Sequence, residues 1–249
     1  MSQRFTSLNM DKKSFKELIK LNIERHGYHV TIVAGAIEPR FAYTIGLMDQ
    51  FRFELVFAGA IYYMKDQLLQ IVKAIVENLR ASGGVVDQRI TIESLGEFSF
   101  LPVHPSWSKL MMFGVFDYFQ KTDIQAYQII PDASHFTYDV PDMSKEWSLL
   151  EPVWQWLVRD WNYSVPAKSN VTTNLDALQG EPITEMARWE EDEWEMFAGS
   201  GIDAKEEDFR IVSLGTILGI DNSLLPALDL KVGEGLWRAD KESNWQNWE

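Results

Sequence analysis

Apolar and polar residues follow two different periods in the first part of the chain. An apolar residue every three or four positions predicts an amphipathic helix, whereas alternation or a short apolar run predicts a strand. The helical period covers residues 11–26, 62–81 and 144–158. Residues 107–119 fit a helix or a strand, and their length and the possible cap at Ser106 favour a helix. The strand patterns cover residues 28–35, 41–47, 53–59, 85–93, 97–103 and 124–130. Because most strands follow one another directly, this order predicts an α+β fold, with packed helices on a mixed, mainly antiparallel sheet.

Capping and turn residues set the expected ends of the helices. Asp11 is the predicted N-cap of the first helix, and Gly27 ends it. Gly83 and Gly84 stop the second helix, and Ser106 is the predicted cap of the third. The second helix is expected to bury an inner stripe formed by Leu68, Leu69, Val72, Ile75, Val76 and Leu79.

The pattern changes after residue 160. Residues 164–185 are rich in Ser, Asn, Thr and Pro and lack apolar periodicity, which predicts a linker. Beyond them, 194–199 matches a strand, and 209–218 begins as a strand and turns helical near Leu214. We therefore expect an α+β domain over 1–160, a linker over 161–185 and a smaller acidic α+β unit over 186–249.

Charge separates the two parts more sharply than periodicity does. The formal net charge is −14, from 37 acidic and 23 basic residues. Residues 160–249 hold 19 of the acids and 7 of the bases, which leaves 18 acids and 16 bases in residues 1–159. A surface this acidic repels nucleic acid and anionic membranes and attracts a basic protein. The simpler alternative is that the charge only aids solubility.

The acids gather around two tryptophans between residues 188 and 208. Trp189 is the expected exposed anchor, whereas Trp194 and Phe197 are expected to hold the small core of the second unit. Clustered like charges repel one another, so a cationic partner is the simplest reason to keep them. The predicted partner-binding residues are Trp189, Glu190, Glu191, Asp192, Glu193, Glu195, Glu206, Glu207 and Asp208. The alternative is that these acids simply face water.

Several chemistries find no support in the sequence. The chain has no cysteine, which excludes disulfides and thiolate sites. It shows no signal segment and no apolar run long enough for a membrane span, so a cytoplasmic location is expected. No Gly-x-Ser-x-Gly elbow occurs. His26 and His29 are three residues apart but have no evident third ligand, so we expect no metal, no cofactor and no catalytic residue.

A rival hypothesis places a small-molecule or enzymatic site in the first domain. Tyr43 and Thr44 precede Gly46 and could present hydroxyls beside exposed backbone, close to His26. The structural alternative is a core strand in which Gly46 permits close packing or a bulge.

Three motifs in the first domain indicate a family. They are "HGYHVTIV" at 26–33, "PRFAYTIGLMDQFRFELVFAG" at 39–59 and "YQIIPD" at 127–132. In this order they resemble the family called domain of unknown function 4262, over about residues 10–155. The chain departs from the family pattern at Phe53, where proline is usual, and at Tyr28, where tryptophan is usual. The resemblance implies no established chemistry.

The second unit resembles another family. The segments "WEMFAGSGID" and "IVSLGTILGIDNSLLPALDLKVGEGLWRA" are similar to immunity protein 33, also called domain of unknown function 2185, over roughly 186–245. Asn222 stands where that family has proline, and its arginine is Arg238 here. The resemblance implies an immunity protein that neutralises a toxin delivered between competing bacteria. We expect this chain to cover the basic active-site surface of such a toxin. The sequence leaves the oligomeric state open.

Overall fold

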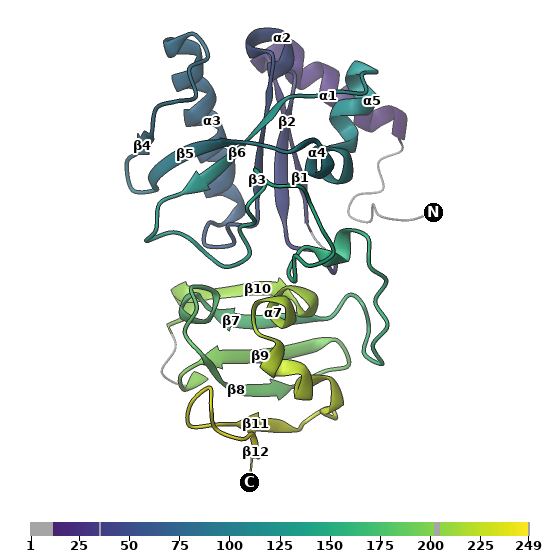
Figure 1. Ribbon diagram of the computed structural model, residues 1–249, viewed down its shortest axis with the longest axis vertical. Helices are drawn as coiled ribbons and strands as arrows, with labels where there is room; N and C mark the ends of the chain where they lie inside the picture. Colours follow the sequence, from purple (N-terminus) through teal and green to yellow (C-terminus); the bar gives the residue numbers. More distant parts are fainter. Residues whose placement is uncertain (1–11, 35, 202–204, 249) are drawn as a thin grey trace.

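The protein contains two six-stranded β-sheets that follow one another along the molecule (Figure 1). The computed structural model describes residues 12–34, 36–201 and 205–248. The first sheet is built from strands between His29 and Pro131, and the second from strands between Asn170 and Asn247. The predicted α+β class, with mixed and mainly antiparallel sheets, is therefore confirmed.

The first sheet has the strand order β1-β2-β3-β6-β5-β4. Its only parallel pair within the described chain is β3 with β6, and each other neighbouring pair is antiparallel. The strands are β1 (His29–Val33), β2 (Phe41–Ile45), β3 (Glu54–Ala58), β4 (Ile90–Ile92), β5 (Gly96–Pro102) and β6 (Ala126–Pro131).

Helices cover both faces of this sheet (Figure 1). Leu55 and Phe57 point to one face, where α3 packs, and Val56 and Ala58 point to the other, which α1, α4 and α5 cover. Strands buried on both faces form continuous apolar runs, which explains the sequence of β3. The helices are α1 (Lys12–His26), α2 (Leu47–Phe51), α3 (Lys65–Ser82), α4 (Pro105–Met111) and α5 (Phe113–Phe119).

Gly27 and Gly83 end α1 and α3 as predicted, both with positive φ. Leu69 is 37% exposed, and Ile71 takes its place in the buried stripe of α3. The predicted cap Asp11 lies outside the described residues.

Two predicted helices in the first domain were wrong in form. Residues 107–119 form two helices separated at Met112, and the side chain of His104, not Ser106, caps the first of them. Residues 144–158 form only the short 3-10 helix η1 (Gln155–Leu157). Pro152 lies inside this segment, and a proline in a helix interior removes one hydrogen bond and clashes with the preceding turn.

The second sheet has the order β10-β7-β9-β8-β11-β12, with β7 and β9 parallel. Helix α7 and the 3-10 helix η4 lie in front of it in the view of Figure 1. The strands are β7 (Asn170–Asn174), β8 (Ile183–Arg188), β9 (Glu193–Ala198), β10 (Phe209–Ser213), β11 (Gly235–Trp237) and β12 (Gln246–Asn247). The helices are α6 (Leu175–Leu178), η3 (Glu206–Asp208), α7 (Leu214–Ile220) and η4 (Asn222–Asp229).

The segment expected to be a linker is part of this sheet. Residues 164–185 contain β7, α6 and the first residues of β8, so the prediction of a linker was wrong. Its polar residues have structural roles: Thr173 is buried in the sheet, and the side chain of Asn174 caps α6. A short strand with one fully buried apolar residue, Val171, gives too weak a periodic signal to detect.

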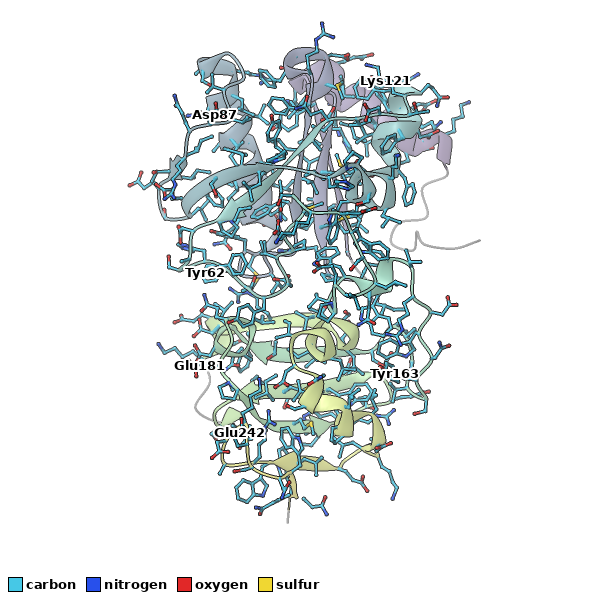
Figure 2. All side chains as sticks on the ribbon, viewed as in Figure 1. Tyr62, Asp87, Lys121, Tyr163, Glu181 and Glu242 are labelled. Carbon is cyan, nitrogen blue, oxygen red and sulfur yellow. The ribbon has the colours of Figure 1, made fainter. Side chains whose placement is uncertain are left out.

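Side chains join the two sheets across their junction. Arg210 of β10 donates to the carbonyls of Ile61 and Tyr62, at 3.1 and 2.7 Å. Each sheet with its packed helices is called a unit here, the first built on the strands from His29 to Pro131 and the second on those from Asn170 to Asn247. Tyr62 lies at the edge of the first unit that faces the second (Figure 2). Gln179 donates to the carbonyl of Ser134 at 3.0 Å. Loop carbonyls of the first unit thus accept hydrogen bonds from side chains of the second.

Candidate partner-binding face

The second sheet has one face covered by helices. Val171, Met186, Trp194 and Met196 point to it and pack with residues of α7 and η4. Trp194 is 1% exposed, so its prediction as a core residue is confirmed. Phe197 is also buried, but it lies on the opposite face of β9, against Phe209 at 5.3 Å between ring centroids.

The opposite face, called here the open face, carries both carboxylates and tryptophans. Strand register fixes its composition, because residues paired across neighbouring strands point to the same side. One row across it contains Ile211, Thr172, Glu195, Ala187 and Gly235. The next row contains Phe209, Asn174, Phe197, Glu185, Trp237 and Gln246.

Trp189 lies on the open face at the end of β8. It is 46% exposed, its indole N–H donates to Glu195 Oε2 at 2.7 Å, and its ring is 6.0 Å from that of Trp248. Its backbone N–H donates to the carbonyl of Glu193, which extends the β8–β9 pairing by one residue. The predicted exposed anchor is therefore accessible and is fixed beside a carboxylate.

Four of the predicted acids form the hairpin between β8 and β9. Glu190, Glu191 and Glu193 are exposed, and Asp192 is partly buried. The guanidinium of Arg188, on the covered side of the sheet, donates to the carbonyls of Glu190 and Glu191 at 3.3 and 2.6 Å. The backbone oxygens of the hairpin, not its carboxylates, accept these bonds, so the carboxylates stay available to a partner.

Lys168 is the cation that pairs with a hairpin carboxylate. Its ammonium contacts Asp192, and this hydrogen bond holds the pKa of Asp192 below its usual value. The guanidinium of Arg188 lies over the Trp194 ring, at 4.6 Å from the centroid, on the covered side. Asp192 is thus already engaged by a cation of the same chain.

The structure separates the predicted acids into two groups. Glu193 is level with Asn170 in the sheet, whereas Phe209, directly after η3, is level with Asn174 at the other end of β7. Glu206, Glu207 and Asp208 therefore lie at the opposite end of the strands from the hairpin. The nine predicted residues do not form one cluster; the hairpin group lies beside the exposed tryptophans.

Two accessible tryptophans of the open face were not among the predicted site residues. Trp237 is 40% exposed and Trp248 is 41% exposed. The backbone N–H of Trp248 donates to the carbonyl of Gly235, and its indole lies directly against that glycine. The signal in the sequence was the alternation of Leu236 and Trp237 in β11, which points one of them outward.

The rival site in the first domain is not assembled. Tyr43 faces the α1, α4 and α5 side of the sheet, where its hydroxyl accepts from the N–H of Gly114 at 3.3 Å. Thr44, on the opposite side of β2, donates to Glu54 at 2.6 Å. His26 is exposed at the end of α1. His29 is buried, its ring contacts Asn22 at 2.8 Å, and burial lowers its pKa.

The residues of the central motif build a buried carboxylate network. Glu54 is fully buried and accepts from Thr44 and from the backbone N–H groups of Gly46, Leu47 and Met48, at 2.6 to 3.3 Å. Burial raises the pKa of Glu54, and these hydrogen bonds lower it, with a net upward direction. Gly46 has φ 115°, which a side chain would strain. The motif "YTIG" therefore serves the fold, as the structural alternative held.

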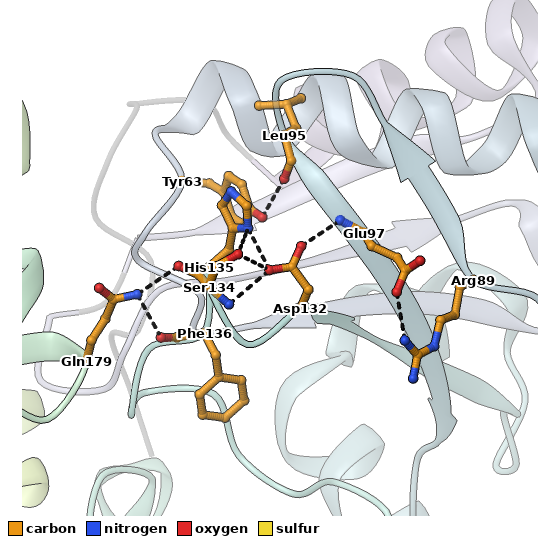
Figure 3. Close-up of polar contacts among 9 residues, drawn as sticks. All are labelled: Tyr63, Arg89, Leu95, Glu97, Asp132, Ser134, His135, Phe136 and Gln179. Atoms are coloured by element: carbon orange, nitrogen blue, oxygen red, sulfur yellow. Dashed lines mark hydrogen bonds and ion pairs between the residues drawn. The ribbon is translucent and has the colours of Figure 1, made fainter.

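A second polar cluster lies on the loop after β6 (Figure 3). Asp132 accepts from the N–H of Glu97 at 2.7 Å and contacts Nδ1 of His135 at 2.8 Å. The His135 ring stacks on Tyr63, with 5.7 Å between centroids. A Cβ on Gly96 would approach both Asp132 and His135 within 3 Å, so this glycine permits their packing. The cluster shapes the loop that Gln179 contacts from the second unit.

Comparisons with known proteins find a family match only for the N-terminal part. Residues 22–137 match a family described as Domain of unknown function (DUF4262), which confirms that resemblance for this part of the chain. The matched segment runs from within α1 to just beyond β6, and its description carries no activity. No curated protein and no solved structure matches the chain. The similarity of residues 186–245 to immunity protein 33 stays a prediction.

Residues 12–34, 36–201 and 205–248 contain no group of three or more potential metal-ligating side chains. In the same ranges, no helix combines the length and apolar character that crossing a membrane requires.

Proposed function

We propose that this protein binds a basic partner protein through the open face of its second sheet. The observation that carries the proposal is the placement of Trp189 beside Glu193 and Glu195, next to the exposed ring of Trp248. Exposed tryptophans supply apolar anchors, and carboxylates around them attract and orient a cationic surface.

The arginines of the second sheet support this assignment because they do not neutralise the open face. Arg188, Arg210 and Arg238 each donate to backbone carbonyls, and Arg238 also pairs with Asp221 at 3.3 Å. Arg188 bonds the hairpin backbone from the covered side of the sheet, and Arg210 points toward the first unit. Of the hairpin acids, Asp192 pairs with Lys168, so Glu190, Glu191 and Glu193 provide the exposed negative surface.

More specifically, we propose that this protein is an immunity protein. Its partner is a cognate antibacterial toxin whose basic active-site surface the open face covers. An enzyme that acts on an anionic substrate needs a cationic cleft, and an acidic surface competes for that cleft. The protein needs no cofactor or catalytic residue for this role.

Charge reversal in the hairpin tests the proposal. The variant Glu190→Lys with Glu193→Lys changes two exposed acids, and Asp87→Lys with Glu93→Lys makes the same charge change in the first unit. From lysate of the native host, wild type and control should retain a basic protein that the hairpin variant loses. The association rate of the wild type should fall about tenfold or more with added salt, since electrostatic steering is screened.

Equal retention by all three proteins would contradict the proposal. A second experiment tests whether the partner is a toxin. Cells that produce the hairpin variant should lose protection from the toxin, while cells that produce the control variant keep it. A retained partner without toxic activity would leave the basic-partner proposal standing and reject the immunity role.

A further inference from the structure

We propose that a pocket beside β11 receives an arginine side chain of the partner; this inference rests on the function proposed above. The pocket has a volume of about 660 Å³ and lies at the β8–β11–β12 edge of the second sheet. Its lining combines two indoles with polar groups: Trp237, Trp248, Glu185, Thr184, Gln246 and Asn247.

Strand register places a carboxylate beside an indole in this pocket. Glu185 of β8 is paired with Trp237 of β11, so both side chains leave the sheet on the open face. Trp248 bounds the pocket next to Gly235, and its ring also lies 6.0 Å from that of Trp189. The pocket is therefore continuous with the face to which the basic partner is assigned.

Glu185 has capacity left to bind a cation. Its Oε2 accepts from the N–H of Gly201 at 2.9 Å, and a carboxylate offers about four acceptor positions in total. A planar guanidinium can donate two parallel hydrogen bonds to a carboxylate while its face rests on an indole. The compact ammonium of lysine cannot make both contacts equally well.

Arg238 also lines the pocket but directs its charge elsewhere. Its side chain is 2% exposed, its Nε donates to the carbonyl of Ile183 at 2.8 Å, and it pairs with Asp221. The Trp245 ring covers the guanidinium, with 4.2 Å from its central carbon to the ring centroid. The incoming cation therefore meets the carboxylate of Glu185, not the guanidinium of Arg238.

The alternative occupant is a neutral sugar, because indoles and amides also suit carbohydrate rings. The excess of acid in this part of the chain, 19 acids against 7 bases over residues 160–249, favours the cation. The charge of the ligand therefore distinguishes the two occupants.

Short peptides and the full-length protein provide the test. Three acetylated, amidated tripeptides, Gly-X-Gly with X as arginine, lysine or citrulline, are titrated while the indole N–H signals of Trp237 and Trp248 are followed by NMR. We expect the arginine peptide to shift both signals, and the neutral citrulline peptide to bind roughly tenfold more weakly, since it lacks the charge-assisted bond. Glu185→Gln should remove this preference, whereas Glu181→Gln, an exposed acid outside the pocket, should keep it.

Three outcomes would overturn the inference: equal binding of arginine and citrulline, equal binding of arginine and lysine, or shifts caused by neutral oligosaccharides and not by arginine. Failure here is distinguishable from failure of the proposed function. If the tripeptides do not bind but capture of the basic protein still depends on Glu190 and Glu193, the function stands and the pocket assignment falls. If arginine binds the pocket while capture ignores the hairpin charge, the proposed function falls instead.

Discussion

Buried polar residues of the first unit form a hydrogen-bond network inside its apolar core. Glu54 lies ten residues after Thr44 and eight after Gly46, and its carboxylate accepts hydrogen bonds from both. Removal of the Glu54 carboxylate would leave buried N–H groups without acceptors, each at a cost of about 1–3 kcal/mol. Residues that suggest a ligand site in the sequence can thus be required by backbone geometry alone.

Asp132 should make the stability of the protein depend on pH in acid. Burial alone would raise the pKa of Asp132, but bonds from Glu97, Ser134 and His135 outweigh it and hold the pKa below its usual value. A carboxyl with a lowered folded-state pKa stabilises the fold above its unfolded value of about 4 and loses this effect as the pH falls further.

Asp132→Asn should therefore lower the free energy of unfolding at pH 7 by on the order of 2 kcal/mol, and the difference from wild type should shrink below about pH 4. Urea unfolding of both proteins between pH 7 and pH 2 measures this difference. A gap that stays constant over this range would show that Asp132 does not act through its charge.

At the scale of elements, helices and strands with strong apolar periodicity could be predicted from the sequence, whereas those with weak periodicity could not. The stripe of α3 and the run of β3 are long or fully buried, so their pattern dominates the local sequence. β7 buries a single large apolar residue, Val171, among Thr and Asn, and its place in the sheet depends on pairing with β9 and β10. Such tertiary pairing leaves no local signal.

The residues of the candidate site were likewise predictable where the signal is local and hidden where it depends on strand pairing. Acid clustering and Trp189 were visible in the sequence, since charge runs are local. That Trp237 and Trp248 lie on the same face as Glu193 depends on the register of β8, β9 and β11, which no local pattern fixes. The separation of Glu206 from the hairpin follows from β9, which runs between them and was expected over residues 194–199.

Gly235 provides a test of the aromatic side of the open face. A Cβ at this position would lie 2.5 Å from Trp248, so Gly235→Ala should displace that indole while β11 keeps its pairing. We expect weaker binding of the basic partner by about three- to tenfold, because an apolar anchor is lost, with a stability change within about 1 kcal/mol.

A double-mutant cycle with Trp248→Ala shows whether the effect passes through Trp248. If it does, Gly235→Ala has no further effect on binding once Trp248 is removed. Additive losses from the two substitutions would mean that Gly235 acts on the interface in some other way.

At the scale of the molecule, the segment between the two sheets contributes to the first unit's core. Trp154 is fully buried against Phe41 and Trp107, and its indole donates to the carbonyl of Asp139 at 2.9 Å. Just before it, Leu150 is 90% exposed. The chain is therefore accessible between the sheets but tied to the first unit on the C-terminal side of that point.

Cleavage at Leu149 or Leu150 should consequently nick the protein without separating its parts. Limited thermolysin digestion should give two fragments on a denaturing gel that elute together in size-exclusion chromatography. Trp154 would remain in the first core, and Arg210 would still donate to Ile61 and Tyr62.

Arg210→Ala should lower the stability of the nicked complex by on the order of 2 kcal/mol, since it leaves these carbonyls without their donors. The fragments of this variant should therefore separate at a lower urea concentration. The neighbouring exposed Ile211→Ala should not change that midpoint. Fragments that elute apart in the absence of urea, or cleavage confined to residues 164–186, would show instead that the two sheets belong to independent domains joined by a linker.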